Sequence, residues 1–297
     1  MSGPSRHYLR GALYGLAAVS IWSGWIVVAR LGLRSSLSPW DIAALRFGVA
    51  GVLLLPYLFR KGLAFDRLGW LGLAAIVLGG AAPVFFANAG LLFAPAAHAG
   101  ALFPGTMPLM VALLAAGLLR EAFTPAKKVG FGFILAGVIG IAWGSGGELG
   151  TRQNLGHGLF LGAGLAWAFY TVAMRKARLD GVHAAAIAAV GAMALYLPLF
   201  ALLPDSTLVT APWRDIALQA VVQGVLTAVI SLLLYGRAVN ILGASSGAAF
   251  AALCPAMTAL LGIPILGEWP APSEWLAIAL ISAGVYVLSG GPLPRLR

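Results

Sequence analysis

The chain has 297 residues, of which 61% are hydrophobic and 9% charged, and its mean hydropathy is +0.94. Soluble domains carry about a quarter charged residues, so this composition excludes a water-soluble globule. The 19 Lys and Arg residues outnumber the 9 Asp and Glu residues, but they lie between apolar runs, where they indicate topology and not nucleic-acid binding. The single cysteine, Cys254, excludes a disulfide or a cysteine metal cluster within the chain. We predict one membrane domain over residues 1–297, without cofactor or metal.

A window of about 19 residues, the length of an apolar membrane span, finds ten apolar segments. They run from Arg10 to Arg30, Trp40 to Phe59, Leu68 to Leu92, Ala96 to Leu119, Ala126 to Trp143, Gly156 to Arg175, Val182 to Leu203, Ile216 to Tyr235, Ala244 to Leu266 and Trp275 to Ser289. The first segment is too long for the apolar part of a signal peptide and lacks a convincing cleavage site. We therefore expect an uncleaved first helix and an all-α membrane protein with ten transmembrane helices.

Lysine and arginine are distributed unevenly between alternate connections. With a cytoplasmic N-terminus, fourteen basic residues fall on the cytoplasmic side and four on the other side. The cytoplasmic set is Arg6, Arg10, Arg60, Lys61, Arg67, Arg120, Lys127, Lys128, Arg175, Lys176, Arg178, Arg237, Arg295 and Arg297, and the outer set is Arg30, Arg34, Arg152 and Arg214. Because basic loops remain inside, and an even number of spans returns the chain to its starting side, we predict that both termini are cytoplasmic.

The two halves of the chain resemble each other. Shifted by 147 residues, Ala97 to Ile139 aligns with Ala244 to Tyr286 with 16 identities in 43 positions. These identities include Pro108/Pro255 and Glu121/Glu268, and a shift of 145 pairs Trp22 with Trp167, Trp25 with Tyr170 and Arg30 with Arg175. We predict two five-helix repeats, about 10–145 and about 155–291, and because five is odd the second repeat is inverted.

These features resemble a known family of membrane proteins. The chain has a tryptophan-containing first span, Leu45-Arg46-Phe47 in the second span, and a Pro then Gly-Glu or Arg-Glu ending the fourth and ninth spans. In these features it resembles the drug/metabolite transporter superfamily. Within it, the chain is most similar to ten-helix EamA-type exporters, in particular the bacterial exporters of aromatic and other amino acids. The resemblance implies a central cavity lined by spans one to four and six to nine, with spans five and ten at the periphery. No short motif encodes the substrate.

Two pairs of aromatic residues are candidates for the cavity wall. Trp22 and Trp25 share one face of the first span, and Trp167 and Tyr170 share the equivalent face of the sixth span, because residues three apart are neighbours on a helix. Inverted repeats bring these spans face to face near the membrane midplane, where flat rings can hold apolar or aromatic side chains. Packing between helices or a position at the lipid interface is the alternative.

A row of polar residues follows the eighth span, each four residues after the last. It consists of Gln219, Gln223, Thr227, Ser231 and Tyr235. We expect consecutive members to touch while the row winds around the helix, since four residues exceed one helical turn. Polar side chains in hydrocarbon face the bundle interior or water, so we assign Gln223, Thr227, Ser231 and Tyr235 to the cavity. Interhelical hydrogen bonding is the alternative.

Three further polar residues lie inside apolar segments. Asn88 in the third span and His98 in the fourth are candidate cavity residues near the predicted outer side, with a structural role as the alternative for His98. Arg46 in the second span is expensive to bury unless it snorkels or pairs, and Asp41 is its expected partner in a structural role.

Prolines and terminal glutamates complete the candidate list. Pro108 and Pro255 occupy equivalent positions in the repeats, so paired kinks in the fourth and ninth spans are candidate hinges, with fixed curvature as the alternative. Glu121 and Glu268 end the same spans and are expected to stabilise loop geometry.

Several chemistries lack their residues. No predicted span has Asp or Glu at its middle, which disfavours exchange of protons for lipophilic cations. P-loop, zinc-protease and serine-hydrolase motifs are also missing, so we assign no catalytic residue and predict no enzyme.

The function predicted from the sequence is secondary transport. We expect a multi-pass protein of the bacterial inner membrane that exports small metabolites, in particular amino acids, by alternating access around a central cavity. A multidrug or other metabolite exporter of the same fold is the alternative, and a membrane-embedded enzyme or scramblase is the alternative of another class. The expected partners are a small-molecule substrate and the lipid bilayer, with no nucleic acid and no protein partner that the sequence indicates.

Overall fold

The computed structural model describes residues 6–122, 124–144, 152–202, 206–243 and 249–289, and over these ranges the chain forms helices and turns without a strand. Eight helices are long and apolar enough to cross a membrane, and two shorter apolar helices, Phe250–Leu266 and Pro272–Leu288, fall at the predicted ninth and tenth spans. The expected all-α membrane fold is confirmed at this level.

The helices follow the predicted spans closely. The first half contains α1 (Arg6–Ser35), α2 (Pro39–Lys61), α3 (Phe65–Gly90), α4 (Ala96–Leu102), α5 (Met107–Leu118) and α6 (Pro125–Gly144). The second half contains α7 (Arg152–Lys176), α8 (Gly181–Phe200), α9 (Trp213–Gln219), η1 (Ala220–Ile230), α10 (Ser231–Leu242), η2 (Phe250–Leu253), α12 (Cys254–Leu266) and α13 (Pro272–Leu288).

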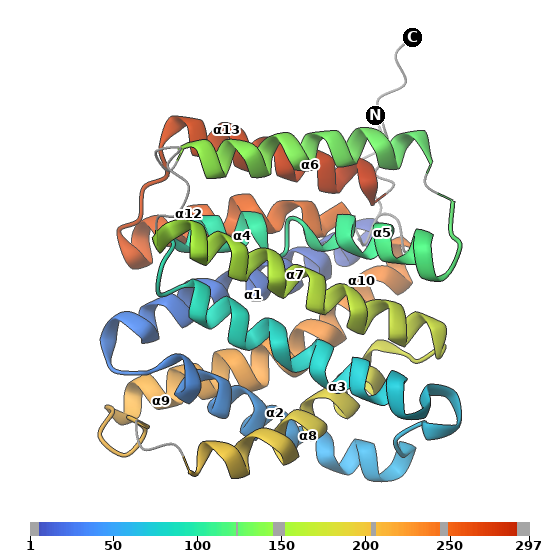
Figure 1. The fold of residues 1–297 in the computed structure, drawn as a ribbon, viewed down its shortest axis with the longest axis vertical. Coiled ribbons are helices and arrows are strands. Elements are labelled where there is room, and N and C mark those ends of the chain that lie inside the picture. The colour runs from blue at the N-terminus through green and yellow to red at the C-terminus, as the bar shows by residue number, and fades with distance from the viewer. Residues whose placement is uncertain (1–5, 123, 145–151, 203–205, 244–248, 290–297) are drawn as a thin grey trace.

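The helices run along one common direction, and the repeats pack with two-fold pseudosymmetry (Figure 1). α3 packs on α7 as α10 packs on α1, and α5 packs on α7 as α12 packs on α1. The pairs α2–α8, α4–α12 and α6–α13 each join equivalent spans of the two repeats. α1 begins and α13 ends at the same end of the bundle, and α7 runs opposite to α1 (Figure 1). These directions are those of two inverted repeats, whereas the membrane face that each end meets stays a prediction.

α6 and α13 form the outer layer of the bundle at the top of Figure 1 and approach each other through glycines. A Cβ atom on Gly137 would lie 2.7 Å from the Ala277 carbonyl oxygen, and one on Gly284 would lie 2.7 Å from the Gly130 carbonyl oxygen. These two contacts are equivalent under the 147-residue shift. Small residues at such positions let helix backbones approach closely in a membrane.

Local signals explain where several helices start. Ser38 caps α2, since its hydroxyl accepts from the Asp41 N–H while the Asp41 carboxylate accepts from the Ser38 N–H, and Pro39 follows at the first position. Asp180 caps α8 by accepting from the His183 N–H at 2.9 Å. Basic residues in the last turns of α2 and α7 complement the helix dipoles.

The fourth span is not the continuous helix that the apolar run Ala96 to Leu119 predicted. Residues 103–106 separate α4 from α5, and the equivalent residues of the second repeat, Phe250–Leu253, form the short 3₁₀ helix η2. Pro104 lacks an N–H donor, and a side chain at Gly105 would collide with the Ala101 carbonyl oxygen. Thr106 Oγ1 donates to the freed Leu102 carbonyl at 2.6 Å. The regular helix is therefore interrupted at the same depth in both repeats, by proline and glycine in the first repeat and by a 3₁₀ segment without either residue in the second.

The eighth span also departs from a regular helix. Residues Ala220–Ile230 between α9 and α10 form a π-helix, whose turns are wider than those of an α-helix. In a π-helix, four residues turn through a smaller angle than in the α-helix assumed for the polar row. The members of the row are therefore placed differently around the axis from the sequence prediction. Thr227 Oγ1 donates to the Val222 carbonyl, five residues earlier, at 2.6 Å. π-helical segments occur frequently at functional sites.

Candidate functional site

A polar and aromatic cluster lies inside the bundle where α1 meets η1 and α10. Trp22 Nε1 donates to Ser231 Oγ at 3.0 Å, and the Trp22 ring packs on the Tyr235 ring with centroids 5.0 Å apart. Ser231 is fully buried and donates to the Thr227 carbonyl at 2.6 Å. Three residues assigned to the cavity from the sequence, Trp22, Ser231 and Tyr235, therefore lie in direct contact.

A second group lies one turn further along α1, at Trp25, and connects α2 to the π-helix η1. Arg46 Nη1 donates to Gln223 Oε1 at 3.1 Å, and the Arg46 guanidinium lies 5.2 Å from the Trp25 ring centroid. Gln223 Nε2 donates to the Trp25 carbonyl at 3.4 Å and to Gln219 Oε1 at 3.2 Å. We call Trp25, Arg46, Gln219 and Gln223 the guanidinium cluster.

Glycines position this cluster. A Cβ atom on Gly224 would lie 2.4 Å from Val49 Cβ, so a larger residue there would push η1 away from α2. On α1, a Cβ at Gly32 would meet the Gln219 amide, whose Nε2 donates to the Val28 carbonyl at 2.6 Å. Close approach of three helices therefore brings two amides and one guanidinium together in the apolar interior.

The expected pairing of Arg46 with Asp41 is wrong. The Asp41 carboxylate accepts from Ser206 Oγ at 3.0 Å and from Thr207 Oγ1 at 2.6 Å, in addition to its role in the α2 cap. These donors occupy Asp41 at the start of the helix, and Arg46 instead donates its hydrogen bond to an amide oxygen 177 residues away. Arg46 is the residue whose surroundings sequence reasoning missed, because a contact between repeats leaves no local signal.

The second aromatic pair has different neighbours. The Trp167 and Tyr170 rings lie 5.0 Å apart, Tyr170 is buried, and Trp167 packs against core residues on both sides of α7. Tyr170 packs against Gly79 and Gly80 of α3. Trp22 contacts Ser231 and Tyr235 of α10, whereas Trp25 contacts Arg46 of α2, Gln223 of η1 and the Phe103 ring. That both pairs line one cavity stays a prediction.

Asn88 lies outside both groups. Its amide is fully buried, its Nδ2 donates to the Pro39 carbonyl at 3.4 Å, and within the described part of the chain its Oδ1 has no hydrogen-bond donor. Among the described residues, the Asn88 side chain forms one hydrogen bond, to α2. The assignment of Asn88 to the cavity stays a prediction.

His98 belongs to a hydrogen-bonded group of side chains that also contains Gln153, His157 and Glu274. His98 Nε2 lies 2.7 Å from Glu274 Oε1, and His98 Nδ1 lies 2.9 Å from His157 Nε2 and 3.3 Å from Gln153 Nε2. These residues come from the first two turns of α4, α7 and α13, which begin at the same end of the bundle. His157 and Glu274 were missed, because residues far apart in sequence meet only through the helix packing. Over the described ranges, no group of three His, Cys, Asp or Glu residues has a geometry that could hold a metal ion.

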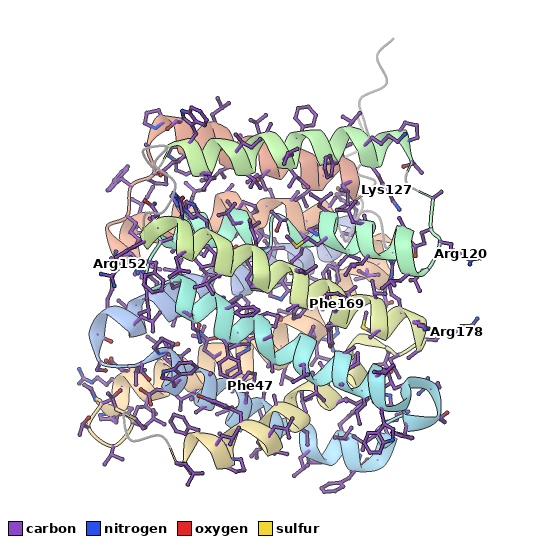
Figure 2. All side chains as sticks on the ribbon, viewed as in Figure 1. Phe47, Arg120, Lys127, Arg152, Phe169 and Arg178 are labelled. Atoms are coloured by element: carbon purple, nitrogen blue, oxygen red, sulfur yellow. The ribbon has the colours of Figure 1, made fainter. Side chains whose placement is uncertain are left out.

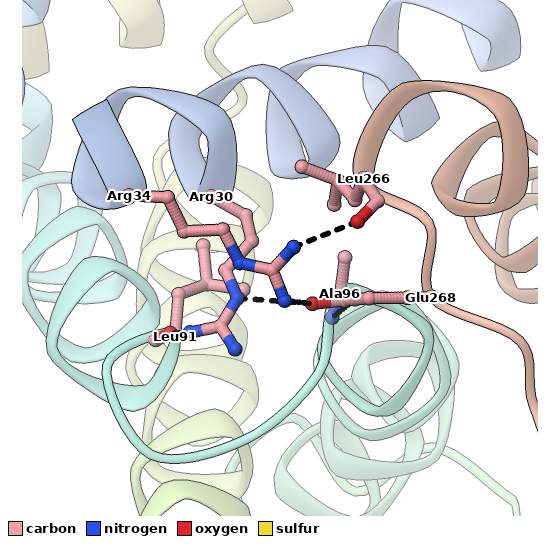
Figure 3. Close-up of polar contacts among 6 residues, drawn as sticks. All are labelled: Arg30, Arg34, Leu91, Ala96, Leu266 and Glu268. Carbon is pink, nitrogen blue, oxygen red and sulfur yellow. Dashed lines mark hydrogen bonds and ion pairs between the residues drawn. The ribbon is translucent and has the colours of Figure 1, made fainter.

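Glu268 closes the same end of the bundle with two arginines of α1 (Figure 3). Its Oε1 accepts from Arg30 Nε at 3.1 Å and from Arg34 Nη2 at 2.5 Å, and its Oε2 accepts from the Ala96 N–H at 2.8 Å. Arg34 also donates to the Leu266 carbonyl at 2.8 Å, and Arg30 to the Leu91 carbonyl. We call Arg30, Arg34 and Glu268 the Glu268 cluster; it joins α1, α4 and α12.

The opposite end holds the repeat equivalent of this cluster. Glu121 accepts from Arg175 at 3.3 Å and lies 3.9 Å from Lys127 Nζ. Figure 2 shows basic side chains such as Arg120, Lys127 and Arg178 at this end, with Arg152 at the other. Glu121 and Glu268 thus form ion pairs with Arg175 and Arg30, which are themselves equivalent.

The interruptions at residues 103–106 and Phe250–Leu253 lie between these ends. Pro108 occupies the first turn of α5, and Pro255 occupies the first turn of α12. Both prolines therefore start a helical segment instead of kinking one from within. Their action as hinges stays a prediction.

Comparisons with known proteins agree with this architecture. The model of the EamA-like transporter family matches twice, over residues 9–143 and 154–290. The chain is 29% identical over 267 residues to the uncharacterized transporter YyaM of Bacillus subtilis, covering 85% of each chain. It is 27% identical over 290 residues to the uncharacterized inner membrane transporter YedA of Escherichia coli, covering 95% of this chain and 91% of that one.

A solved crystal structure shares the fold. It superposes with a TM-score of 0.62 at 23% sequence identity, covering 93% of this chain and 95% of that chain. The family model accounts for most of the residues, and the names of the relatives are those of transporters and not of enzymes. The chain therefore belongs to the EamA-like transporter family and is a multi-pass membrane transporter.

Proposed function

We propose that this protein exports amino acids and related small metabolites across the bacterial inner membrane by alternating access. The observation that carries the proposal is the contact between repeats in the bundle interior, where Trp22 meets Ser231 and Tyr235. An aromatic wall beside amides and hydroxyls suits a solute with an apolar side chain and a polar backbone. Transporters built from inverted repeats bind their substrates at such interfaces near the bilayer midplane.

The same proposal gives the helix interruptions a role. Alternating access requires one part of the bundle to move against the other around a fixed site. The breaks before Pro108 and Pro255 lie at equivalent depths, and broken helices absorb a change of backbone angle more readily than continuous ones. We assign these two positions as the hinges of the fourth and ninth spans.

Counterflow in proteoliposomes tests the function. Vesicles loaded with unlabelled phenylalanine, leucine, alanine or glycine are diluted into the labelled amino acid, with protein-free vesicles as the control. A transporter accumulates label transiently in exchange for the internal solute, and the solute is recovered unchanged. Chemical conversion of the solute, or movement of labelled lipid without exchange of solute, would replace the proposal with an enzyme or a scramblase.

The aromatic wall makes a second, sharper test. Trp22→Ala removes the ring that packs on Tyr235 and should lower the apparent affinity for phenylalanine about fivefold, since an aromatic contact contributes on the order of 1 kcal/mol. Glycine should lose less, because it does not reach the wall. Trp143→Ala is the matched control, since Trp143 is 76% exposed on the peripheral helix α6.

Trp167→Ala decides whether the second aromatic pair belongs to the same cavity. A change in substrate profile resembling that of Trp22→Ala supports one shared cavity. A uniform loss for every amino acid, together with lower thermal stability, means that Trp167 packs the interface of α7 and contributes no wall.

A further inference from the structure

The guanidinium cluster contains a positive charge, Arg46, that meets no negative partner among the residues that the structure describes. Arg46 is the eighth residue of α2, about 10 Å along the helix at 1.5 Å per residue, so it lies well within the apolar span. The ion pairs formed by the described residues involve Arg30, Arg34, His98, Lys127 and Arg175, and none of them includes Arg46. A cation within a membrane span is costly unless another group compensates its charge.

The guanidinium also has unused hydrogen-bonding capacity. It carries five N–H donors, and among the described contacts one of them reaches an acceptor, Gln223 Oε1 at 3.1 Å. The side chain is partly exposed, which leaves part of its surface accessible to a solute. The Trp25 ring beneath it, 5.2 Å from the guanidinium carbon, holds the plane in position.

The charge occurs in one repeat only. Under shifts of 145 to 147 residues, Arg46 corresponds to Gly191, Ala192 or Met193 on α8, and none of these is charged. Arg46 therefore places a charge in the first repeat that has no counterpart at the equivalent position of the second, beside the amides of Gln219 in α9 and Gln223 in η1. A site with this asymmetry distinguishes the two ends of a solute.

We propose that Arg46 binds the carboxylate of the transported solute. This inference rests on the proposed function and narrows its substrate class to amino acids and other small monocarboxylates, excluding amines that lack a carboxylate. A carboxylate matches the planar fork of a guanidinium and accepts two parallel hydrogen bonds from it. It also neutralises a charge that has no counter-ion in the described part of the chain, whereas a cationic solute would be repelled.

Three probes that share one ring separate the charges. Phenylalanine carries both a carboxylate and an ammonium group, 3-phenylpropanoate carries the carboxylate alone, and phenethylamine carries the ammonium alone. We expect the purified full-length protein in detergent to be stabilised against heat by the first two and not by phenethylamine, because a ligand that binds the folded state raises its melting temperature. The same three solutes are then used in counterflow.

Two substitutions test the residue itself. Arg46→Gln keeps a hydrogen-bonding side chain and removes the charge, and it should weaken binding of phenylalanine and 3-phenylpropanoate roughly tenfold or more. Arg46→Lys keeps the charge but lacks the planar fork of the guanidinium, and its affinity for the two carboxylates should lie between those of the wild type and Arg46→Gln. Arg237→Gln is the matched control, since Arg237 is exposed on α10 and contacts the Tyr14 ring instead of the cluster; it should bind as wild type.

Each outcome decides the inference. Equal binding of phenethylamine and 3-phenylpropanoate by the wild-type protein, binding of none of the three probes, or undiminished carboxylate binding by Arg46→Gln would overturn it. The comparison of probes on the wild-type protein stands even where a variant fails to fold. Binding that depends on Arg46 without counterflow supports the inference and refutes transport, whereas counterflow that ignores the charge of the probe supports transport and refutes the inference.

Discussion

The two ends of the bundle carry the same ion pair in different surroundings. At one end the side chains of Arg30 and Glu268 are 17% and 12% exposed, and Arg34 and the Ala96 N–H complete the coordination of the carboxylate. At the other end the side chains of Arg175 and Glu121 are 47% and 38% exposed. Equivalent residues in the two repeats are thus packed at one end and open to solvent at the other.

Under the alternating access that we propose, this difference is expected to reverse during transport. If the repeats exchange conformations, each end takes the surroundings that the other has now. The Glu268 cluster then opens, while Arg175 and Glu121 become packed between α5 and α7. The ion pairs at the two ends are therefore expected to stabilise opposite states of one equilibrium, because a group that favours one state shifts the populations toward it.

The largest expected effect concerns which end faces the cytoplasm. A reporter fused after Lys61, at the Glu121 end, should report the cytoplasm, and one fused after Ser36, at the Glu268 end, should report the periplasm, because basic residues concentrate at the first of these ends. Each reporter enzyme is active on one side of the membrane and inactive on the other, so the readout is all-or-none. Reversed signals would place the Glu268 end in the cytoplasm and the Glu121 end in the periplasm, while the difference in packing between the two ends would remain.

Removing each glutamate measures the difference in surroundings directly. Glu268→Gln leaves two arginines facing a neutral amide in a largely buried site and should lower the free energy of unfolding on the order of 3 kcal/mol. Glu121→Gln is the matched change in the open pair and should cost less than about 1 kcal/mol. Unfolding in mixed detergent micelles measures both, and equal losses would mean that the two ends are equally packed.

A pair of glycine substitutions probes the packing without changing charge. A Cβ atom on Gly100 in α4 would lie 2.5 Å from Thr258 Cβ on α12, whereas one on Gly117 in α5 would meet nothing within 4 Å. Gly100→Ala should therefore destabilise the protein by about 1–3 kcal/mol. Gly117→Ala should be neutral or stabilise it by up to about 1 kcal/mol through helix propensity. Thermal unfolding of both variants checks this, and a loss at Gly117 would indicate that this end is packed as well.

Apolar length predicted most of the fold. The run Trp40 to Phe59 anticipated α2, which spans Pro39–Lys61, because backbone groups in lipid must be satisfied within the helix. Proline predicted a kink in the fourth span at Pro108, but the full break at residues 103–106 was not predicted. Proline in a membrane helix is tolerated or disruptive according to its neighbours, and the compensating Thr106 hydroxyl has no sequence pattern.

The candidate site was less predictable. The sequence identified Trp22, Ser231 and Tyr235 separately, but their contact joins residues more than 200 positions apart. Opposite charge and closeness in sequence predicted Asp41 as the partner of Arg46. In the structure the Asp41 carboxylate instead accepts hydrogen bonds from the hydroxyls of Ser206 and Thr207. The repeat alignment found Arg30/Arg175 and Glu121/Glu268 as separate matches, and only the packing of the spans shows that each arginine meets a glutamate.

Cross-linking the packed end tests alternating access most directly. Arg34→Cys and Leu266→Cys, in a Cys254→Ser background, put thiols on α1 and α12 where the Arg34 guanidinium now donates to the Leu266 carbonyl, and they retain the Arg30–Glu268 pair. A short bifunctional methanethiosulfonate reagent should stop counterflow of phenylalanine, and reductant should restore it, while each single-cysteine variant remains unaffected. Counterflow at the uncross-linked rate with α1 and α12 joined would contradict the account.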